Sequence, residues 1–344
     1  MASNVVLVTG VGGHLGGRLV ARLANNPNIE RVIGVDTVAP TMRLLERMGR
    51  AEFVRADIRN PLIAKVISNA DVDTVVHASC TAHPAGPGRR TAIKEMNVIG
   101  TMQLLAACQR APKVRKLVVK STAAVYGASS RAPAVFTEDS KLVPSSSSGY
   151  SKDAVEVEGY VRGFSRRRPD VDVTVVRLTN LIGPSVDTVL TRYFSLPITP
   201  SVFGSDARMQ FLHADDALTV LEQATLTKNP GVFNVGGDGV LTLSQAIRRA
   251  RRFEVPVPRS VMPVAGRVFS GAPLVDFSTD QLQLLNFGRV VDTTRLKQDF
   301  GYTPKYSTRE AFDDYVNGRA LRPVVGTSWL SGLERRLGSG APAT

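Results

Sequence analysis

A glycine-rich segment near the start of the chain constrains the fold more than any other feature of the sequence. An apolar, β-branched run at residues 5–9 precedes this segment, and Leu15, Leu19 and Leu23 follow it at helical spacing. Glycines between a strand and a helix let the backbone approach a pyrophosphate, whose charge then lies at the amino terminus of the helix. We therefore expect a β-turn-α unit that holds dinucleotide phosphates with Gly10, Gly13, His14, Leu15 and Gly16.

Asp36 indicates which dinucleotide this unit binds. It ends a second apolar run, at residues 31–36, and follows Gly16 by twenty positions. A carboxylate there accepts hydrogen bonds from the adenosine ribose hydroxyls and repels a 2′-phosphate. The next arginine along the chain is Arg43. These features favour NAD over NADP, and the alternative is that Asp36 only forms the turn at the end of a strand.

The rhythm of short β-branched runs and helical stretches continues to residue 178. Candidate strands cover residues 31–36, 52–56, 74–78, 116–121 and 173–178, with a later one at 232–235. Candidate helices cover residues 14–25, 42–48, 62–68, 92–110 and 149–166. Successive β-α-β units produce a parallel sheet with helices on both faces. The predicted fold class is α/β: a Rossmann-type doubly wound parallel sheet with a smaller C-terminal α/β substrate lobe.

A change of pattern suggests where the lobes divide. Residues 1–178 form the predicted NAD-binding domain, and proline and glycine punctuate the chain beyond it. Residues 179–337 are assigned mainly to the substrate lobe, with a segment at about 210–236 returning to the first domain. Short helices are expected there at 243–252 and 308–317. The small, polar residues 338–344 are expected to form a disordered tail.

The net charge of +13 is compatible with nucleic acid, a membrane surface or an acidic substrate. Its arginine clusters, at 89–90, 166–168, 248–252 and 335–336, lack interleaved aromatics and any nucleic-acid module, so we interpret them as solvated helix faces and expect no specific nucleic-acid partner. No charged leader precedes the first apolar run, and no run approaches the roughly eighteen apolar residues of a membrane span. The sequence predicts a cytoplasmic location without membrane association. The scattered histidines and the two cysteines have no metal-ligand spacing, so no metal site is expected.

A series of motifs over nearly the whole chain resembles the extended short-chain dehydrogenase/reductase family, which includes UDP-sugar epimerases and nucleotide-sugar dehydratases. The motifs beyond the glycine turn are Asp57-Ile58, Val76-His77-Ala78, Asn97-Val98-Ile99-Gly100-Thr101, Ser121 to Gly127, Lys152, Arg177 to Pro184, Gln210 to Ala217, Phe233 to Gly236 and Arg289 to Asp292. The resemblance implies that Asp57 and Ile58 contact the adenine, that His77, Ala78 and Asn97 belong to the cofactor site, and that Lys152 holds the nicotinamide ribose. His77 and His213 are expected to be structural rather than catalytic.

The resemblance also defines a reaction centre, from which this sequence departs. The family uses a tyrosine as the acid/base, with a lysine four residues later and a serine or threonine that orients the substrate oxygen. Thr122 and Lys152 match two of these positions, but Ser148 occupies the tyrosine position. A serine hydroxyl is shorter and far less acidic than a phenol. Tyr150 could replace the missing group only if the segment begins irregularly, because on a helix it lies about 200° around the axis from Ser148 and Lys152. Tyr150 instead aligns with Ala154, Val157, Val161 and Phe164, a helical stripe that we expect to face the core.

The family pattern implies contacts for the substrate as well. Asn180 would contact the substrate phosphates, and Arg289 would pair with a diphosphate. Tyr126 would support the sugar region, and the alternative is that Tyr126 acts as the base. The leading hypothesis is an NAD-dependent epimerase/dehydratase-like enzyme that acts on a nucleotide sugar, such as a UDP-sugar, or a related hydroxyl substrate through an atypical acid/base centre. The alternative is a catalytically silent NAD-binding sensor or partner protein. A homodimer is expected through the helices at 92–110 and 149–166, with Met96, Ile99, Val157 and Val161 available for the interface.

Overall fold

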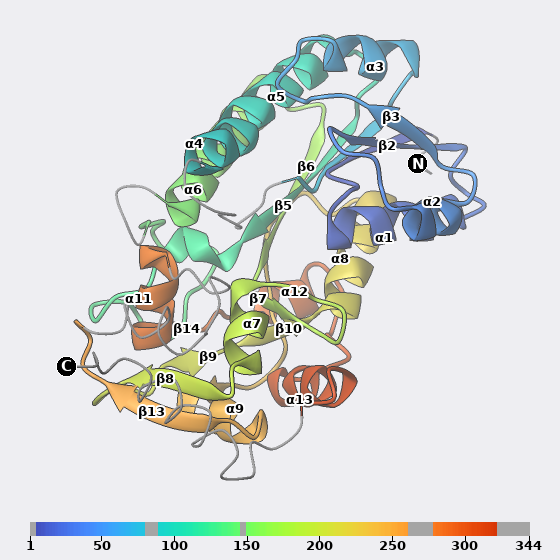
Figure 1. The fold of residues 1–344 in the computed structure, drawn as a ribbon. Coiled ribbons are helices and arrows are strands. Elements are labelled where there is room, and N and C mark those ends of the chain that lie inside the picture. Colours follow the sequence, from blue (N-terminus) through green and yellow to red (C-terminus); the bar gives the residue numbers. More distant parts are fainter. Residues whose placement is uncertain (1–4, 80–88, 145–148, 261–277, 322–344) are drawn as a thin grey trace, which may run out of the picture.

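The computed structural model describes residues 5–79, 89–144, 149–260 and 278–321. Its central element is a seven-stranded parallel sheet with the strand order β11-β6-β5-β4-β1-β2-β3, which confirms the predicted doubly wound α/β fold (Figure 1). The strands are β1 (Val5–Thr9), β2 (Arg31–Asp36), β3 (Glu52–Arg55), β4 (Thr74–His77), β5 (Lys116–Thr122), β6 (Asp172–Leu178) and β11 (Gly231–Val235).

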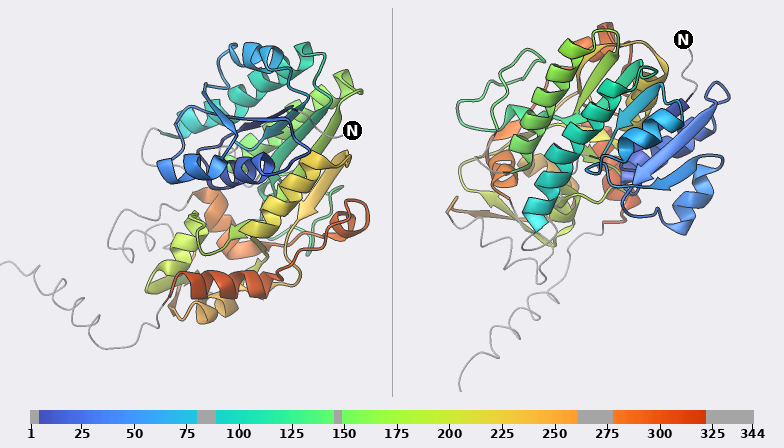
Figure 2. Two further views of the ribbon diagram at one scale, coloured as in Figure 1. Left: turned by 90° about the vertical axis from the view of Figure 1, so that its right-hand side faces the viewer. Right: turned by 90° about the horizontal axis from the view of Figure 1, so that it is seen from above.

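Each face of the sheet has its own hydrophobic core and its own layer of helices (Figure 2). Side chains alternate along a strand, so in β1 Val6 and Val8 enter one core, while Val5 and Leu7 enter the other. The first core is shared with α1 (His14–Ala24) and α8 (Ala214–Leu226), and α2 (Met42–Met48) packs against α1. The second is shared with α3 (Ile63–Asn69), α5 (Gly100–Arg110) and α6 (Tyr150–Arg167).

The helix predicted at residues 92–110 is not continuous. The structure has α4 (Arg89–Lys94), a π-helical turn at Glu95–Ile99, and then α5. Thr101 donates from its hydroxyl to the carbonyl of Asn97, four residues earlier, and both side chains are buried. A threonine that bonds back to the preceding turn distorts a helix locally. The irregularity lies just before Thr101, whose hydroxyl also contacts His77 at the end of β4.

The predicted dimer surface was wrong at two of its four residues. Val157 and Val161, on α6, are each 2% exposed and belong to the core beneath the sheet, so neither is available to a second chain. Met96 is partly buried against the same core, whereas Ile99 is 44% exposed. The prediction failed because a helix in contact with a sheet and a helix in contact with a partner show the same apolar periodicity.

The second lobe is built from small sheets that sequence periodicity did not reveal. Its aromatic core contains Tyr193, Phe194, Phe211, Phe312 and Tyr315. The strands are β7 (Asn180–Ile182) with β10 (Phe211–His213), β8 (Ile198–Val202) with β13 (Phe253–Val257), and β12 (Leu241–Thr242), β9 (Arg208–Met209) and β14 (Gly288–Arg289). The helices are α7 (Val189–Ser195), α9 (Leu243–Arg249), α11 (Thr279–Phe287), α12 (Thr294–Gln298) and α13 (Thr308–Gly318).

Asp216 and His213 fix the junction between the lobes. The buried carboxylate of Asp216, at the start of α8, accepts hydrogen bonds from the Tyr302 hydroxyl at 2.6 Å and from the backbone N–H groups of Lys305 and Tyr306. His213 caps the same helix, since its Nδ1 accepts from the backbone N–H of Asp215. Its ring stacks on that of Tyr306, with centroids 4.0 Å apart. These contacts give His213 a structural position.

Two of the arginines that contribute to the positive charge, Arg168 and Arg50, donate hydrogen bonds to backbone carbonyls at helix ends. Arg168 donates to the carbonyls of Cys108, Gln109, Ala111 and Val114, and so satisfies the end of α5. Arg50 does the same at the end of α1, with four carbonyl acceptors between residues 24 and 30. The last carbonyls of a helix lack intrahelical donors, and a cation there is favourable. Among the described residues, no helix is long and apolar enough to cross a membrane.

Candidate cofactor and substrate site

The glycine turn is a cradle that side chains would fill. Gly10 has a φ of 76°, and a Cβ added there would lie 2.6 Å from the Cα of Ser79. A Cβ on Gly16 would lie 2.2 Å from the carbonyl oxygen of Gly10, so the first turn of α1 packs directly on the loop. Gly13 caps α1 without a side chain, and the first N–H groups of a helix have no intrahelical acceptor. The cradle therefore fits a pyrophosphate at the amino terminus of α1.

Asp36 lies beside this cradle, at the carboxyl end of β2. One carboxylate oxygen accepts from the backbone N–H of Gly12 at 2.9 Å, and the other accepts from the backbone N–H of Thr37 at 2.7 Å. The residue as a whole is half-buried. This is the geometry that an adenosine ribose requires next to a glycine turn.

His77 forms part of the wall beneath the cradle as a neutral group. Its Nδ1 lies 2.9 Å from the Thr9 hydroxyl, and its Nε2 lies 2.8 Å from the Thr101 hydroxyl. Because Thr101 donates its own proton to the Asn97 carbonyl, it accepts from Nε2–H, which fixes the tautomer. Complete burial, reinforced by Lys120, lowers the pKa of His77 to about 3. Ala78 and Asn97 are also buried here.

Asp57 and Ile58, the residues expected at the adenine, lie between β3 and α3. Ile58 is 4% exposed, and its side chain would collide with a Cβ on Gly100, at 2.8 Å. The Asp57 carboxylate accepts from the Arg59 guanidinium at 2.6 Å, which lowers the pKa of Asp57. Arg59 also contacts Glu95. The Asp57 carboxylate is thus already held by a protein cation.

The predicted reaction centre is only partly described. Thr122 ends β5, and its hydroxyl accepts from the backbone N–H of Ala124 at 3.1 Å while the side chain stays half-buried. Ser148 lies outside the described residues. Lys152 is half-buried in the first turn of α6, and no hydrogen-bond or ion-pair partner for it exists in the described parts of the chain. Tyr150 is the first helical residue and is also half-buried, while the predicted stripe behind it is buried: Ala154, Val157, Val161 and Phe164.

Tyr126 belongs to a buried polar network around Arg177. The guanidinium of Arg177 binds both carboxylate oxygens of Glu158, at 2.6 Å from Nη2 and 3.0 Å from Nε. It also donates to the Tyr126 hydroxyl at 2.7 Å, and that hydroxyl in turn donates to Asn234. The phenol therefore has both a donor and an acceptor from the protein. Glu158 and Asn234 carry this network, and no sequence motif had marked Glu158.

Arg289 lies in β14 and is 8% exposed. Its Nε donates to the carbonyl of Gly127 at 2.7 Å, but its two Nη groups have no hydrogen bond or ion pair within the described residues. Burial lowers the pKa of Arg289 to about 10, against the opposing influence of the Asp280 carboxylate and the Tyr150 phenol. Asn180, expected nearby, donates from its side chain to the carbonyl of Gln210 at 3.0 Å.

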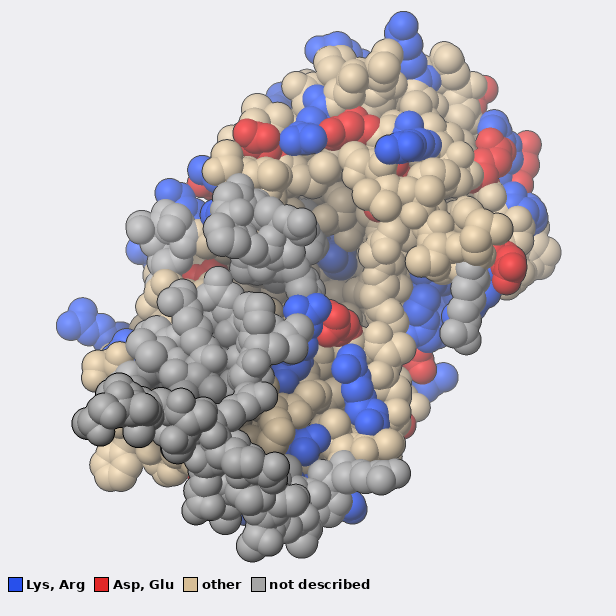
Figure 3. All heavy atoms as spheres, viewed as in Figure 1, with Lys and Arg blue, Asp and Glu red and all other residues tan. Residues whose placement is uncertain are grey.

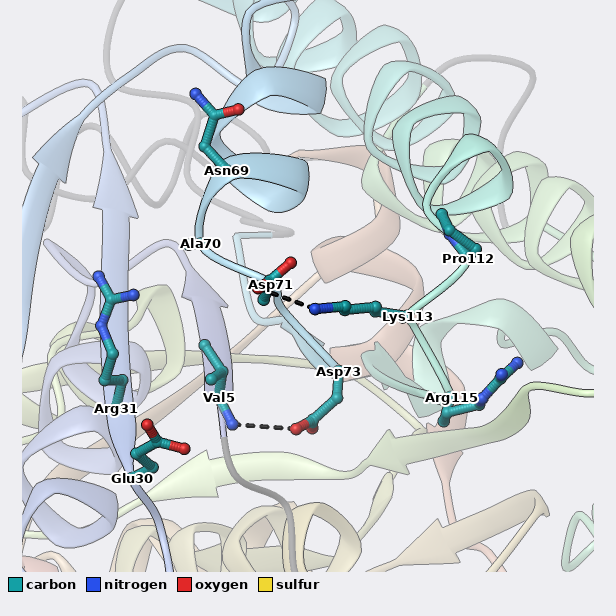
Figure 4. A pocket seen from close by; sticks show the side chains of 10 residues that line it. All are labelled: Val5, Glu30, Arg31, Asn69, Ala70, Asp71, Asp73, Pro112, Lys113 and Arg115. Carbon is teal, nitrogen blue, oxygen red and sulfur yellow. Dashed lines mark hydrogen bonds and ion pairs between the residues drawn. The ribbon is translucent and has the colours of Figure 1, made fainter.

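A hollow of about 660 Å³ lies at the opposite edge of the sheet, around the amino ends of β1, β2, β4 and β5 (Figure 4). Its three cationic side chains have partners within the protein: Lys113 pairs with Asp71 at 2.8 Å, Arg31 with Glu52, and Arg115 with Asp170. Ligands of open α/β sheets bind outside the carboxyl ends of the strands. The hollow between the two lobes, where charged side chains of both signs gather, lies on that other side (Figure 3).

The fold and the site together define a class: a dinucleotide-binding α/β protein with a second, smaller lobe beside its parallel sheet. The chain belongs to the NAD dependent epimerase/dehydratase family, whose model matches residues 6–236, and its cofactor is accordingly NAD. An uncharacterized protein of Mycobacterium tuberculosis is 52% identical over 98% of this chain and 92% of its own length. The UDP-glucose 4-epimerase of Mycolicibacterium smegmatis is 28% identical over 88% of this chain and 95% of its own length.

Solved structures share the fold. The dTDP-glucose 4,6-dehydratase of Bacillus anthracis in complex with NAD has a TM-score of 0.69 and 20% sequence identity, covering 92% of this chain and 97% of that one. The UDP-glucose 4-epimerase of Thermotoga maritima with UDP-glucose has a TM-score of 0.67 and 21% identity, covering 91% of this chain and 98% of that one.

Proposed function

We propose that this protein is an NAD-dependent enzyme of the epimerase/dehydratase type that acts on a nucleotide sugar through an atypical acid/base centre. Bound NAD supplies a hydride acceptor and donor. The glycine turn would hold its pyrophosphate, Asp36 its adenosine ribose, and Lys152 its nicotinamide ribose. Asp57 and Ile58 would contact the adenine, and His77, Ala78 and Asn97 would form the remaining wall.

One observation carries the substrate class: the uncompensated charge of Arg289. Burying a cation is costly unless an anion pairs with it. Arg177, in the same lobe junction, has such a partner, but the Nη groups of Arg289 have none among the described residues. A guanidinium binds a phosphate through two parallel hydrogen bonds. The diphosphate of a nucleotide sugar supplies the missing anion, and Asn180 would contact its phosphates.

Calorimetry with UDP tests this proposal directly. Arg289→Met should weaken UDP binding by about 10- to 100-fold, because a charge-assisted hydrogen bond contributes about 1.5–3 kcal/mol. Arg295→Met is the matched control, since the Arg295 side chain is 43% exposed and pairs with Asp139. Equal UDP affinities for the two variants would contradict the proposal.

The reaction centre would depend on Thr122, which orients the substrate oxygen, and on the group that takes its proton. Ser148 at the tyrosine position favours one second candidate, an NAD-binding protein that does not turn over. Replacing Ser148 with Tyr should raise the rate on the true substrate by about two to four orders of magnitude, which is the usual contribution of a general base. Loss of wild-type turnover in Tyr150→Phe or Tyr126→Phe would instead identify that phenol as the base.

A homodimer remains part of this proposal, through Ile99 from the sequence prediction and two further exposed residues. Ile99, Met102 and Tyr160 are exposed on the layer that contains α5 and α6, at 44%, 42% and 39%. We expect light scattering to report a dimer at micromolar concentration, and Met102→Glu to shift it toward the monomer. A monomeric wild type would remove this part of the proposal.

A further inference from the structure

The first turn of α6, which carries Lys152, is held by a carboxylate from the other lobe. Asp280 lies in the first turn of α11 and is 8% exposed. One of its oxygens accepts from the backbone N–H of Ser151 at 2.9 Å, and the other accepts from the Ser151 hydroxyl at 3.0 Å. Ser151 is completely buried, so water cannot replace these two bonds. The two helices approach each other at this point in Figure 1.

A cation from the nucleotide-binding lobe holds the same turn from the other side. Arg90, in α4, binds both oxygens of the buried Asp153 carboxylate, at 2.6 Å and 2.7 Å. It also donates to the carbonyl of Gly149 at 2.9 Å. The turn from Gly149 to Asp153 is therefore fixed at both of its ends by Arg90 and in its middle by Asp280. Lys152 directly follows the residue that Asp280 binds.

A simple helix cap does not require this arrangement. Within the substrate lobe, Asp206 caps α9 through the same pair of bonds, from the backbone N–H of Ser244 at 2.9 Å and its hydroxyl at 2.8 Å. That cap is local to one lobe and exposed. Asp280 differs because it joins two lobes, is buried, and lies in the first turn of the helix that leads directly into Arg289, the cation assigned above to the diphosphate.

We propose that Asp280 is a positioning residue that couples the anion site at Arg289 to the cofactor site at Lys152. Its carboxylate holds the Lys152 turn, and its helix, α11, leads directly into β14 and Arg289. An anion bound at Arg289 draws the substrate lobe, and α11 with it, onto the site, which seats Lys152 for the nicotinamide ribose. The inference rests on the proposed roles of Arg289 and Lys152, and it predicts that UDP tightens NAD binding through Asp280.

The test measures NAD affinity by calorimetry with and without saturating UDP. In the wild type, UDP should increase NAD affinity several-fold. Asp280→Ala should weaken NAD binding by about tenfold, because it removes two hydrogen bonds to a charged acceptor, and UDP should no longer affect it. Asp206→Ala is the matched control. It loses the same pair of bonds at α9, so its melting temperature should fall while its NAD affinity and its response to UDP stay unchanged.

Further variants separate the possible failures. Ser151→Ala loses one bond and Asp280→Asn loses the charge, so both should show intermediate effects even if Asp280→Ala does not fold. The emission of bound NADH at saturation should shift in these variants and not in Asp206→Ala, because only they displace the nicotinamide pocket. If Lys152→Met weakens NAD binding but neither Asp280→Asn nor Ser151→Ala does, the coupling is overturned while the proposed function stands. If Lys152→Met leaves NAD affinity unchanged, the proposed role of Lys152 fails, and this inference fails with it.

Discussion

Arg177 and Arg289 are both buried arginines, 5% and 8% exposed, and both stand in motifs typical of the family, yet they have opposite surroundings. Arg177 is bound by Glu158 and by the Tyr126 hydroxyl, and these partners raise its pKa despite its burial. Arg289 has one carbonyl acceptor in the described structure, and burial lowers its pKa. Within the described residues, all three nitrogens of the Arg177 guanidinium donate hydrogen bonds to protein groups, whereas only Nε of Arg289 does.

The difference separates a structural cation from one that we propose to bind a ligand, although sequence motifs alone treat the two alike. A buried charge with a complete set of partners is a fixed part of the fold, and removing it leaves those partners unpaired. A buried charge with spare donors costs the protein stability, and a bound anion can recover that loss. The two sites should therefore respond to the same substitution in different ways.

The largest expected effect is on stability at Arg177. Arg177→Met leaves the Glu158 carboxylate buried without its cation, so the free energy of unfolding should fall by about 3–5 kcal/mol. Urea denaturation measures this change. Adding Glu158→Leu to the first substitution should recover much of the loss, because no uncompensated charge then remains in the core. A single variant as stable as the wild type would show that the network is not the structural element described here.

His77 extends the comparison to a buried group that avoids the cost of a buried charge because it remains neutral. Its pKa in the folded protein is about 3, below the ordinary value near 6.5, so the unfolded chain takes up a proton first as the pH falls. Its contribution is complete above about pH 6.5 and is lost toward pH 3, with a slope of about 1.4 kcal/mol per pH unit. Denaturation of the wild type and His77→Gln between pH 4 and pH 7 checks this, and parallel curves would contradict it.

Arg289 should show a much smaller effect on stability than Arg177. Arg289→Met removes one hydrogen bond to Gly127 but also removes the cost of a buried charge, so the free energy of unfolding should change by no more than about 1 kcal/mol. The measurement is urea denaturation without ligand. A loss comparable to that of Arg177→Met would erase the distinction between the two sites.

The smallest expected effect concerns Asp36, a half-buried carboxylate that we propose to bind the adenosine ribose. NAD should raise the melting temperature more than NADP at equal concentration. The Asp36 carboxylate would repel the 2′-phosphate of NADP, and the ligand that binds more tightly stabilises the native state more. Asp36→Ala should reduce the preference for NAD about fivefold, since two charges near 4 Å apart interact with about 1 kcal/mol in water. A wild type with equal shifts for both dinucleotides would be evidence against the assigned role.

The nucleotide-binding lobe could be predicted closely because its strands are buried on both faces and appear as uninterrupted β-branched runs. The prediction for β1 and β2 matched the structure at every residue, and that for α6 was displaced by one. The second lobe could not be predicted in the same way, because β9, β12 and β14 have two residues each and no periodicity. The π-helical turn at Glu95–Ile99 was also missed, since it depends on a hydrogen bond and not on an apolar pattern.

The residues of the candidate site differ in the same way: some could be predicted from the sequence and others could not. Gly10, Gly16 and Asp36 could be recognised because one local segment contains the whole chemical requirement. Asp280 and Arg90 could not, since their partners lie 129 and 63 positions away in the chain. Arg90 even belonged to a cluster that we had interpreted as a solvated helix face. Spatial partners of this kind leave no spacing signal in a sequence.

The place of β11 in the sheet has a consequence for how the protein is made. This edge strand pairs in parallel with β6, yet α7 and β8, both parts of the other lobe, lie between the two along the chain. Until residue 235 has left the ribosome, β6 is an edge strand with unpaired backbone groups, which is a hazard for aggregation. The nucleotide-binding lobe is thus not completed before the first part of the second lobe, β7 to β10, has been synthesised. A fragment that ended at residue 178 would lack the strand that closes its own sheet.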